Sequence, residues 1–175
     1  GDMHAAVMVQ ALKQRRDDLH LVGVGGTRLA AEGVELLERA ERIAVVGFVE
    51  VIRHLPILRR LMASLRARLD TGRVKLVVLI DYPGFNMRVA REAKRRGIPV
   101  LYYITPQVWA WHKSRLRALR ETVTKAAVIL PFEEAFLRDG GIDATFVGSP
   151  LIDATASLPS RVAACDALAL DHGRP

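Results

Sequence analysis

The chain has 175 residues, half of them hydrophobic, which is enough for one folded domain with its own core and excludes a disordered protein. It carries 26 Lys and Arg against 19 Asp and Glu, and the resulting net charge of +7 favours an anionic partner: nucleic acid, an acidic lipid surface or a phosphorylated substrate. The only cysteine, Cys165, excludes an internal disulfide and a cysteine-based metal cluster.

Three further absences narrow the class of protein. No apolar run approaches the roughly 20 residues that span a bilayer, and the sequence starts without a signal-peptide pattern, so we expect a soluble or surface-bound protein. Aromatic residues make up only 6% of the chain and do not alternate with basic ones, so we expect no nucleic-acid partner. Closely spaced His, Cys or paired Asp ligands are missing from the sequence, so we expect no metal and no cofactor.

The first third of the chain predicts a helix, a strand and a second helix. Apolar residues recur at helical spacing over residues 3–14, and this helix follows Gly1 and Asp2 directly, as if a strand and a turn preceded them. Residues 19–24 predict a short buried strand and residues 27–32 another helix. The glycine-rich loop between them either cradles a phosphate or is a plain tight turn.

Residues 43–69 combine an apolar stripe with many arginines, a pattern typical of an amphipathic helix. Pro56 suits the first turn of a helix, so we predict a short helix ending at His54 and a longer one starting at Pro56. This segment either packs on the sheet or lies on an anionic membrane surface. In the second case the membrane-facing residues are Val45, Val46, Phe48, Val49, Ile52, Leu55 and Leu58.

The most informative stretch is KLVVLIDYPGFN, residues 75–86. Its branched apolar run over residues 76–80 predicts a strand buried on both faces of a parallel sheet, and Asp81 stands where that strand ends. Ligands bind beyond the carboxyl ends of such strands, so Asp81 is a candidate catalytic residue. It can equally cap the helix predicted over residues 85–96.

The remaining chain continues the alternation of strands and helices. Strands are predicted over residues 98–104, 125–130 and 144–147, and helices over 131–137 and 160–170. The loop at 105–111 carries Gln107, Trp109 and Trp111, which form a ligand wall or anchor the loop in the core. The alternation predicts an α/β fold with a doubly wound parallel sheet and right-handed crossovers, in which residues 1–155 form the domain and residues 156–175 a helix and linker.

Several motifs in order resemble the N-terminal half of the lipid-A-disaccharide synthase family, inverting, metal-independent GT-B glycosyltransferases of family 19. They are GDMHAA, LVGVGG, AVVGFVEV, LIDYPGFN, YYITPQVWAW, ILPFEEAF and FVGSPLID. The resemblance runs from Gly1 to about Asp153. It implies a Rossmann-like N-terminal domain that lacks its first strand, and a C-terminal UDP-binding domain outside this sequence.

The resemblance also implies an activity: transfer of 2,3-diacylglucosamine from UDP-2,3-diacylglucosamine to 2,3-diacylglucosamine 1-phosphate, at the cytoplasmic face of the inner membrane. It places the general base on Asp81 and puts Gly1 and Asp2 near the active site. It also makes the Val45 to Met62 region the membrane surface. Gln107, Trp109 and Trp111 are then candidates for substrate binding.

Two other functions are compatible with the sequence. Another GT-B enzyme or a UDP-sugar epimerase could use the same half-fold on a soluble substrate, without any need for the apolar stripe near Phe48. A non-catalytic module that binds phosphorylated glycolipids or acidic membranes would keep its binding when Asp81 is replaced by Asn.

Overall fold

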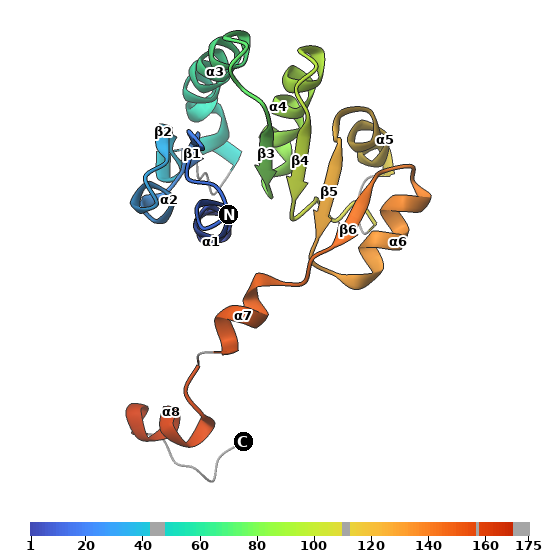
Figure 1. Cartoon of the computed structure of the whole chain (residues 1–175). Helices are drawn as coiled ribbons and strands as arrows, with labels where there is room; N and C mark the ends of the chain where they lie inside the picture. The colour runs from blue at the N-terminus through green and yellow to red at the C-terminus, as the bar shows by residue number, and fades with distance from the viewer. Residues whose placement is uncertain (43–47, 110–112, 157, 170–175) are drawn as a thin grey trace.

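The structure is a computed structural model that describes residues 1–42, 48–109, 113–156 and 158–169. Within its helices, the description leaves out the side chains of residues 48–54, 113, 114, 153, 154 and 156. Strands and helices alternate along the chain (Figure 1). The strands are β1 (Val22–Gly25), β2 (Glu35–Arg39), β3 (Val77–Ile80), β4 (Val100–Tyr103), β5 (Lys125–Val128) and β6 (Ala144–Phe146). The helices are α1 (Asp2–Lys13), α2 (Thr27–Ala31), α3 (Phe48–Asp70), α4 (Pro83–Arg95), α5 (Lys113–Thr122), α6 (Pro131–Asp139), α7 (Pro150–Ala156) and α8 (Arg161–Leu168), with a 3-10 turn, η1, at Ala40–Arg42.

The strands pair in two parallel groups. Strands β3, β4, β5 and β6 are hydrogen-bonded in this order, and β1 pairs with β2. Parallel strands joined by helices confirm the predicted α/β class. The groups are linked by packing, because Ile80 of β3 contacts the small core formed by α1, α2 and Val34, the residue before β2. The strand expected before Gly1 stays a prediction.

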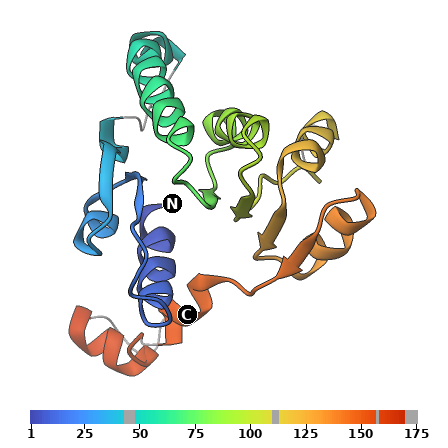
Figure 2. The ribbon, with the colours of Figure 1, turned by 45° about the horizontal axis from the view of Figure 1, so that its top comes forward.

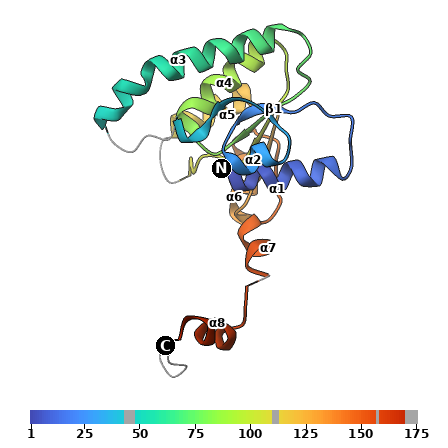
Figure 3. The same ribbon diagram turned by 90° about the vertical axis from the view of Figure 1, so that its left-hand side faces the viewer.

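The helices pack against the strands in two groups. Helices α3, α4 and α5 lie side by side in one layer, whereas α1 and α2 pack together on the other side (Figure 2). The main core lies between the four-stranded sheet and the first of these layers, and Val100, Tyr102 and Val128 of the sheet are fully buried in it. Helices α7 and α8 project away from this body (Figures 1 and 3). The predicted boundary near residue 155 stays a prediction.

Helix α3 corrects the expectation of a break at Pro56. It is one helix from Phe48 to Asp70, with Pro56 inside it. Proline removes one backbone hydrogen bond there, but the helix continues because Leu61 and Leu69 are buried on its inner face and Met62 packs against the main core. Its amino-terminal end projects past the neighbouring helices (Figure 3). In the part of the chain that the structure describes, no helix is both long and apolar enough to cross a membrane.

Three elements were missed by the sequence analysis, for local reasons. Strand β2 carries Glu and Arg at three of its five positions, ELLER, so it lacks the apolar run of the other strands. Helix α5, KSRLRALRET, is so basic that it shows only a narrow apolar stripe, in which Leu119 is buried. Helix α7 is short and exposes Leu151 and Ile152, so it follows no core-facing pattern.

An ion-pair cluster around Glu92 joins α3 to α4. The buried Glu92 carboxylate accepts hydrogen bonds from Arg96 at 2.8 Å, from Arg66 of α3 at 2.9 Å and from Arg95 at 3.1 Å. Arg96 also donates to Asp70 at the end of α3, at 2.6 Å. Hydrogen bonds from Arg96 and Arg66 hold the pKa of Glu92 below its ordinary value. Glu92 is therefore a charged link between the two helices.

Replacing Glu92 with Gln tests this link. The variant leaves Arg96 and Arg66 without their shared carboxylate, so we expect the free energy of unfolding at pH 7 to fall by about 1–3 kcal/mol. Because the folded-state pKa is depressed, the ionised carboxylate stabilises the fold above the ordinary value of 4.5. We expect the difference from the native protein to disappear as the pH falls through the lower folded-state pKa.

Urea denaturation at pH 7 and in acid measures both effects. The control is Glu121→Gln, which removes a carboxylate that pairs with Arg117 on the exposed face of α5. We expect no measurable change from it, because exposed ion pairs contribute little. Equal stability of Glu92→Gln and Glu121→Gln would contradict a structural role for Glu92.

Candidate active site

The turn after β3 has an unusual backbone conformation. Strand β3 ends at Ile80, and the next two residues, Asp81 and Tyr82, have φ angles of 51° and 44°. Residues other than glycine rarely adopt this left-handed region, at a cost of roughly 1–3 kcal/mol each, and such residues cluster at functional sites. Pro83 then begins α4, and the Asp81 side chain is exposed. The turn presents a carboxylate at the carboxyl edge of the sheet.

Two side chains hold this turn by its backbone. The Asp81 carbonyl accepts hydrogen bonds from Tyr102 Oη at 2.8 Å and from Asn86 Nδ2 at 2.7 Å, and Asn86 also donates to the Ile80 carbonyl at 3.1 Å. Tyr102 is fully buried. Burial, and then the nearby Asp81 charge, raise the pKa of Tyr102, so its hydroxyl stays protonated and remains a donor.

A cavity of about 320 Å³ opens beside Asp81. The carboxyl ends of β3 and β4 and the first turn of α5 form it, with Asp81, Pro83, Ile104, Thr105, Pro106, Gln107 and Arg115 as its lining. Ile104 has a φ of 59°, so a third residue at this cavity adopts the left-handed backbone conformation. The structure thus brings together two of the predicted site residues, Asp81 and Gln107.

Trp109 anchors the loop that follows β4. Its indole N–H donates to Glu133 at 3.1 Å, and its ring packs edge-on against Phe132 at 5.1 Å between ring centroids. Glu133 is itself buried and also caps the start of α6. Trp109 is outside the lining of the cavity next to Asp81, although 41% of it is exposed. Its predicted substrate contact stays untested, and Trp111 lies outside the described residues.

Asp2 makes structural contacts at the start of α2. Its carboxylate accepts hydrogen bonds from the backbone N–H groups of Gly26 at 2.6 Å, Arg28 at 3.1 Å and Leu29 at 3.3 Å. A Cβ at Gly26 would lie 2.7 Å from the same carboxylate, so a side chain at this position would displace the Asp2 carboxylate. The backbone N–H groups that could bind a phosphate already donate to Asp2. This favours a plain tight turn over a phosphate-binding loop. The substrate role of Gly1 and Asp2 stays a prediction.

Two further residues near Asp81 were missed by the sequence analysis. Arg115 was one of several basic residues in α5, and no sequence signal separates it from Arg117. His4 was one of five scattered histidines. Burial lowers the pKa of His4, while the Asp81 carboxylate acts in the opposite direction, and the buried Nδ1 of His4 has no hydrogen-bond partner among the described residues.

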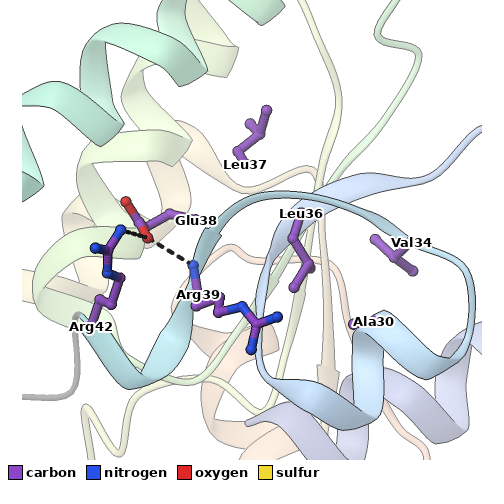
Figure 4. A pocket seen from close by; sticks show the side chains of 7 residues that line it. All are labelled: Ala30, Val34, Leu36, Leu37, Glu38, Arg39 and Arg42. Carbon is purple, nitrogen blue, oxygen red and sulfur yellow. Dashed lines mark hydrogen bonds and ion pairs between the residues drawn. The ribbon is translucent and has the colours of Figure 1, made fainter.

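A larger cavity, about 560 Å³, lies on β2, η1 and the end of α2 (Figure 4). Two of its charged side chains already bind each other, because Glu38 forms an ion pair with Arg42 at 3.5 Å. Glu38 also accepts a hydrogen bond from the backbone N–H of Arg39. Leu36 and Val34 supply an apolar wall. This cavity has no carboxylate at the end of a central strand, so the smaller cavity is the better candidate for chemistry. Over the described residues, no group of three or more His, Cys, Asp or Glu could hold a metal ion.

A parallel α/β domain with a carboxylate and an arginine at one pocket, beyond the carboxyl ends of its strands, is typical of enzymes that act on small molecules. The family model described as lipid-A-disaccharide synthetase matches residues 1–175. The chain belongs to this family.

Curated relatives agree with the family match. The chain is 40% identical over 175 residues to the lipid-A-disaccharide synthase of Myxococcus xanthus, covering 100% of this chain and 46% of the relative. It is 46% identical over 161 residues to that of Syntrophus aciditrophicus, covering 92% of this chain and 42% of the relative. A similar protein from Geobacter metallireducens is 41% identical over 174 residues, 99% of this chain and 45% of the relative. The chain spans just under half the length of these relatives.

The hydrogen bond from Tyr102 to the Asp81 turn can be removed without changing the packing volume much. We expect Tyr102→Phe to lower the free energy of unfolding by about 1 kcal/mol, because the Asp81 carbonyl loses one of its two donors. Urea denaturation measures the change. The control is Tyr82→Phe, since Tyr82 is 48% exposed and no described residue bonds to its hydroxyl. A smaller effect at Tyr102 than at Tyr82 would show that the bond does not hold the turn.

Proposed function

We propose that the chain is the acceptor-side half of an inverting glycosyltransferase. The enzyme transfers 2,3-diacylglucosamine from UDP-2,3-diacylglucosamine to 2,3-diacylglucosamine 1-phosphate and produces lipid A disaccharide 1-phosphate and UDP. Family membership over the whole chain supports this reaction class. The observation that carries the proposal is the exposed Asp81 carboxylate at the mouth of a cavity beyond β3 and β4.

In this reaction Asp81 is the general base. It takes the proton from the acceptor's 6-hydroxyl as that oxygen attacks the anomeric carbon of the donor. The bond from the anomeric carbon to the diphosphate breaks, and UDP leaves with the bonding electrons. Attack from the side opposite UDP inverts the anomeric configuration. A positioned base contributes roughly 100- to 10,000-fold in rate.

The backbone of the turn holds the Asp81 carboxylate in a defined position. Tyr102 and Asn86 fix its backbone, so the carboxylate needs no large rearrangement before it meets the hydroxyl. The cavity walls Pro83 and Pro106 are conformationally restricted and shape the space beside it. The remaining half of the protein, by the same proposal, supplies most of the UDP site.

We further propose that the start of α3 rests on the cytoplasmic face of the inner membrane. Leu55 is exposed and Leu58 is half-buried, and the exposed Arg59 and Arg60 follow them directly. This combination suits an anionic lipid surface. Of the other predicted membrane-facing residues, Val45 and Val46 lie outside the described residues, and so do the side chains of Phe48, Val49 and Ile52.

The catalytic role of Asp81 is tested by Asp81→Asn in the full-length protein. Asparagine keeps the shape of the side chain and tolerates the left-handed backbone, so the fold should be preserved. We expect kcat to fall by about 100- to 10,000-fold with little change in KM. The assay is UDP release in detergent micelles containing both proposed substrates.

The control for this assay is Asp139→Asn, the same change at the exposed end of α6, away from the cavity. We expect it to keep native activity. Unchanged activity in Asp81→Asn would reduce Asp81 to a structural residue of the turn. A native protein that releases no UDP would contradict the proposed reaction itself.

The membrane proposal is tested by vesicle binding. Replacing Leu55 with Ser removes one exposed apolar side chain at the start of α3, so we expect binding to anionic vesicles to weaken roughly 5-fold, for about 1 kcal/mol of lost apolar burial. Co-sedimentation with vesicles of phosphatidylglycerol and phosphatidylethanolamine measures it. The matched control is Leu151→Ser on α7, where the leucine is 55% exposed. Equal binding by the two variants would rule out this end of α3 as the contact.

A further inference from the structure

Arg115 is a cation without an assigned partner beside the proposed base. It lies in the first turn of α5, half-exposed, and lines the same cavity as Asp81. Its neighbour Arg117 pairs with Glu121 at 2.8 Å on the outer face of the helix. Among the described residues, Arg115 makes no hydrogen bond or ion pair. The described part of the chain therefore gives Arg115 a place in the cavity lining but no protein partner.

Asp81 and Arg115 line the same cavity without forming an ion pair with each other. Among the described lining residues, Asp81 is the only acidic one and Arg115 the only basic one, yet the two form no ion pair. Pro83, Ile104 and Pro106 provide the apolar or restricted walls, and Thr105 and Gln107 the remaining polar groups. Both charges stay open to whatever occupies the cavity.

The charges of both residues reach the same buried hydroxyl. Burial raises the pKa of Tyr102 most and the Asp81 carboxylate raises it further, whereas a hydrogen bond with Asn86 and then the charge of Arg115 act in the opposite direction. Because Tyr102 Oη also bonds to the Asp81 carbonyl at 2.8 Å, Arg115 lies within electrostatic range of the turn that holds the base.

An anionic ligand that approaches Asp81 is repelled by its carboxylate, and this repulsion must be offset for the two to share a cavity. A guanidinium suits that task, because its planar set of N–H donors matches two oxygens of a phosphate. An arginine already paired with protein carboxylates would be a poor choice, which distinguishes Arg115 from Arg117 and Arg96.

We propose that Arg115 binds a phosphate group of a substrate in the cavity where Asp81 acts. The inference rests on the proposed function for the identity of the substrates. Two sources share this chemistry: the 1-phosphate of the acceptor and the diphosphate of the UDP donor. In both cases the attacking hydroxyl of the acceptor lies at Asp81, and a negatively charged phosphate oxygen lies at Arg115.

The experiment compares Arg115→Ala and Arg115→Lys in the full-length protein, with Arg117→Ala as the matched control on the same helix. Steady-state kinetics are measured with the acceptor and with an acceptor that lacks its 1-phosphate. Binding of UDP is measured by calorimetry, which needs no turnover. We expect Arg115→Ala to weaken kcat/KM or UDP binding roughly 10- to 100-fold. Arg115→Lys should recover part of the loss, and Arg117→Ala should resemble the native protein.

The two sources separate cleanly. A loss that disappears with the acceptor lacking phosphate assigns Arg115 to the acceptor's 1-phosphate. A loss that persists with this acceptor, together with weaker UDP binding, assigns it to the donor. Native kinetics and native UDP binding in Arg115→Ala would overturn the proposal, and so would a loss that only follows a lower Tm. These outcomes are distinct from a failure of the proposed function. If the proposed function is wrong, the native protein itself forms no disaccharide.

Discussion

The hydrogen bonds that Tyr102 and Asn86 donate to the Asp81 carbonyl are the constraint on which the site depends. They hold a left-handed turn that the chain would otherwise avoid, directly after a buried strand. Because β4 lies beside β3 in the sheet, the buried Tyr102 can reach across to this turn. The core therefore stabilises the position of an exposed carboxylate, and α4 can begin immediately after it.

Helix α4 connects the site to the helical layer. It begins with Pro83 in the wall of the cavity and ends near Glu92 and Arg96, which bind Arg66 and Asp70 of α3. Helix α3 in turn carries the exposed Leu55 at its other end. One continuous set of contacts thus runs from the proposed membrane surface to the proposed base. In the proposed reaction, this path connects the membrane surface, where the acyl chains stay, to the cavity where the sugar reacts.

The chain spans just under half the length of its curated relatives, and the proposed function makes its site one side of an active site shared with the remaining half. In the described part of the chain, the cavity beside Asp81 is lined by one carboxylate, Asp81, and one guanidinium, Arg115. In the proposed reaction the nucleotide is held mostly by the other half of the enzyme. Under this proposal, the small cavity beside Asp81 needs to hold only the reacting end of the acceptor.

The sequence by itself determined the alternation of strands and helices, the position of Asp81 at the end of a strand and the family, because apolar runs and the motif IDYPGFN are local signals. It did not predict β2 or α5, whose charged residues mask a narrow apolar pattern. It placed a break at Pro56, since it could not weigh one lost hydrogen bond against the burial of Leu61 and Leu69 on the inner face of α3. Only the tertiary structure selected Arg115 among similar arginines and joined Tyr102 to the Asp81 turn. Those relations depend on which strand ends meet at one edge of the sheet, and residues distant in the sequence become neighbours only when the sheet forms.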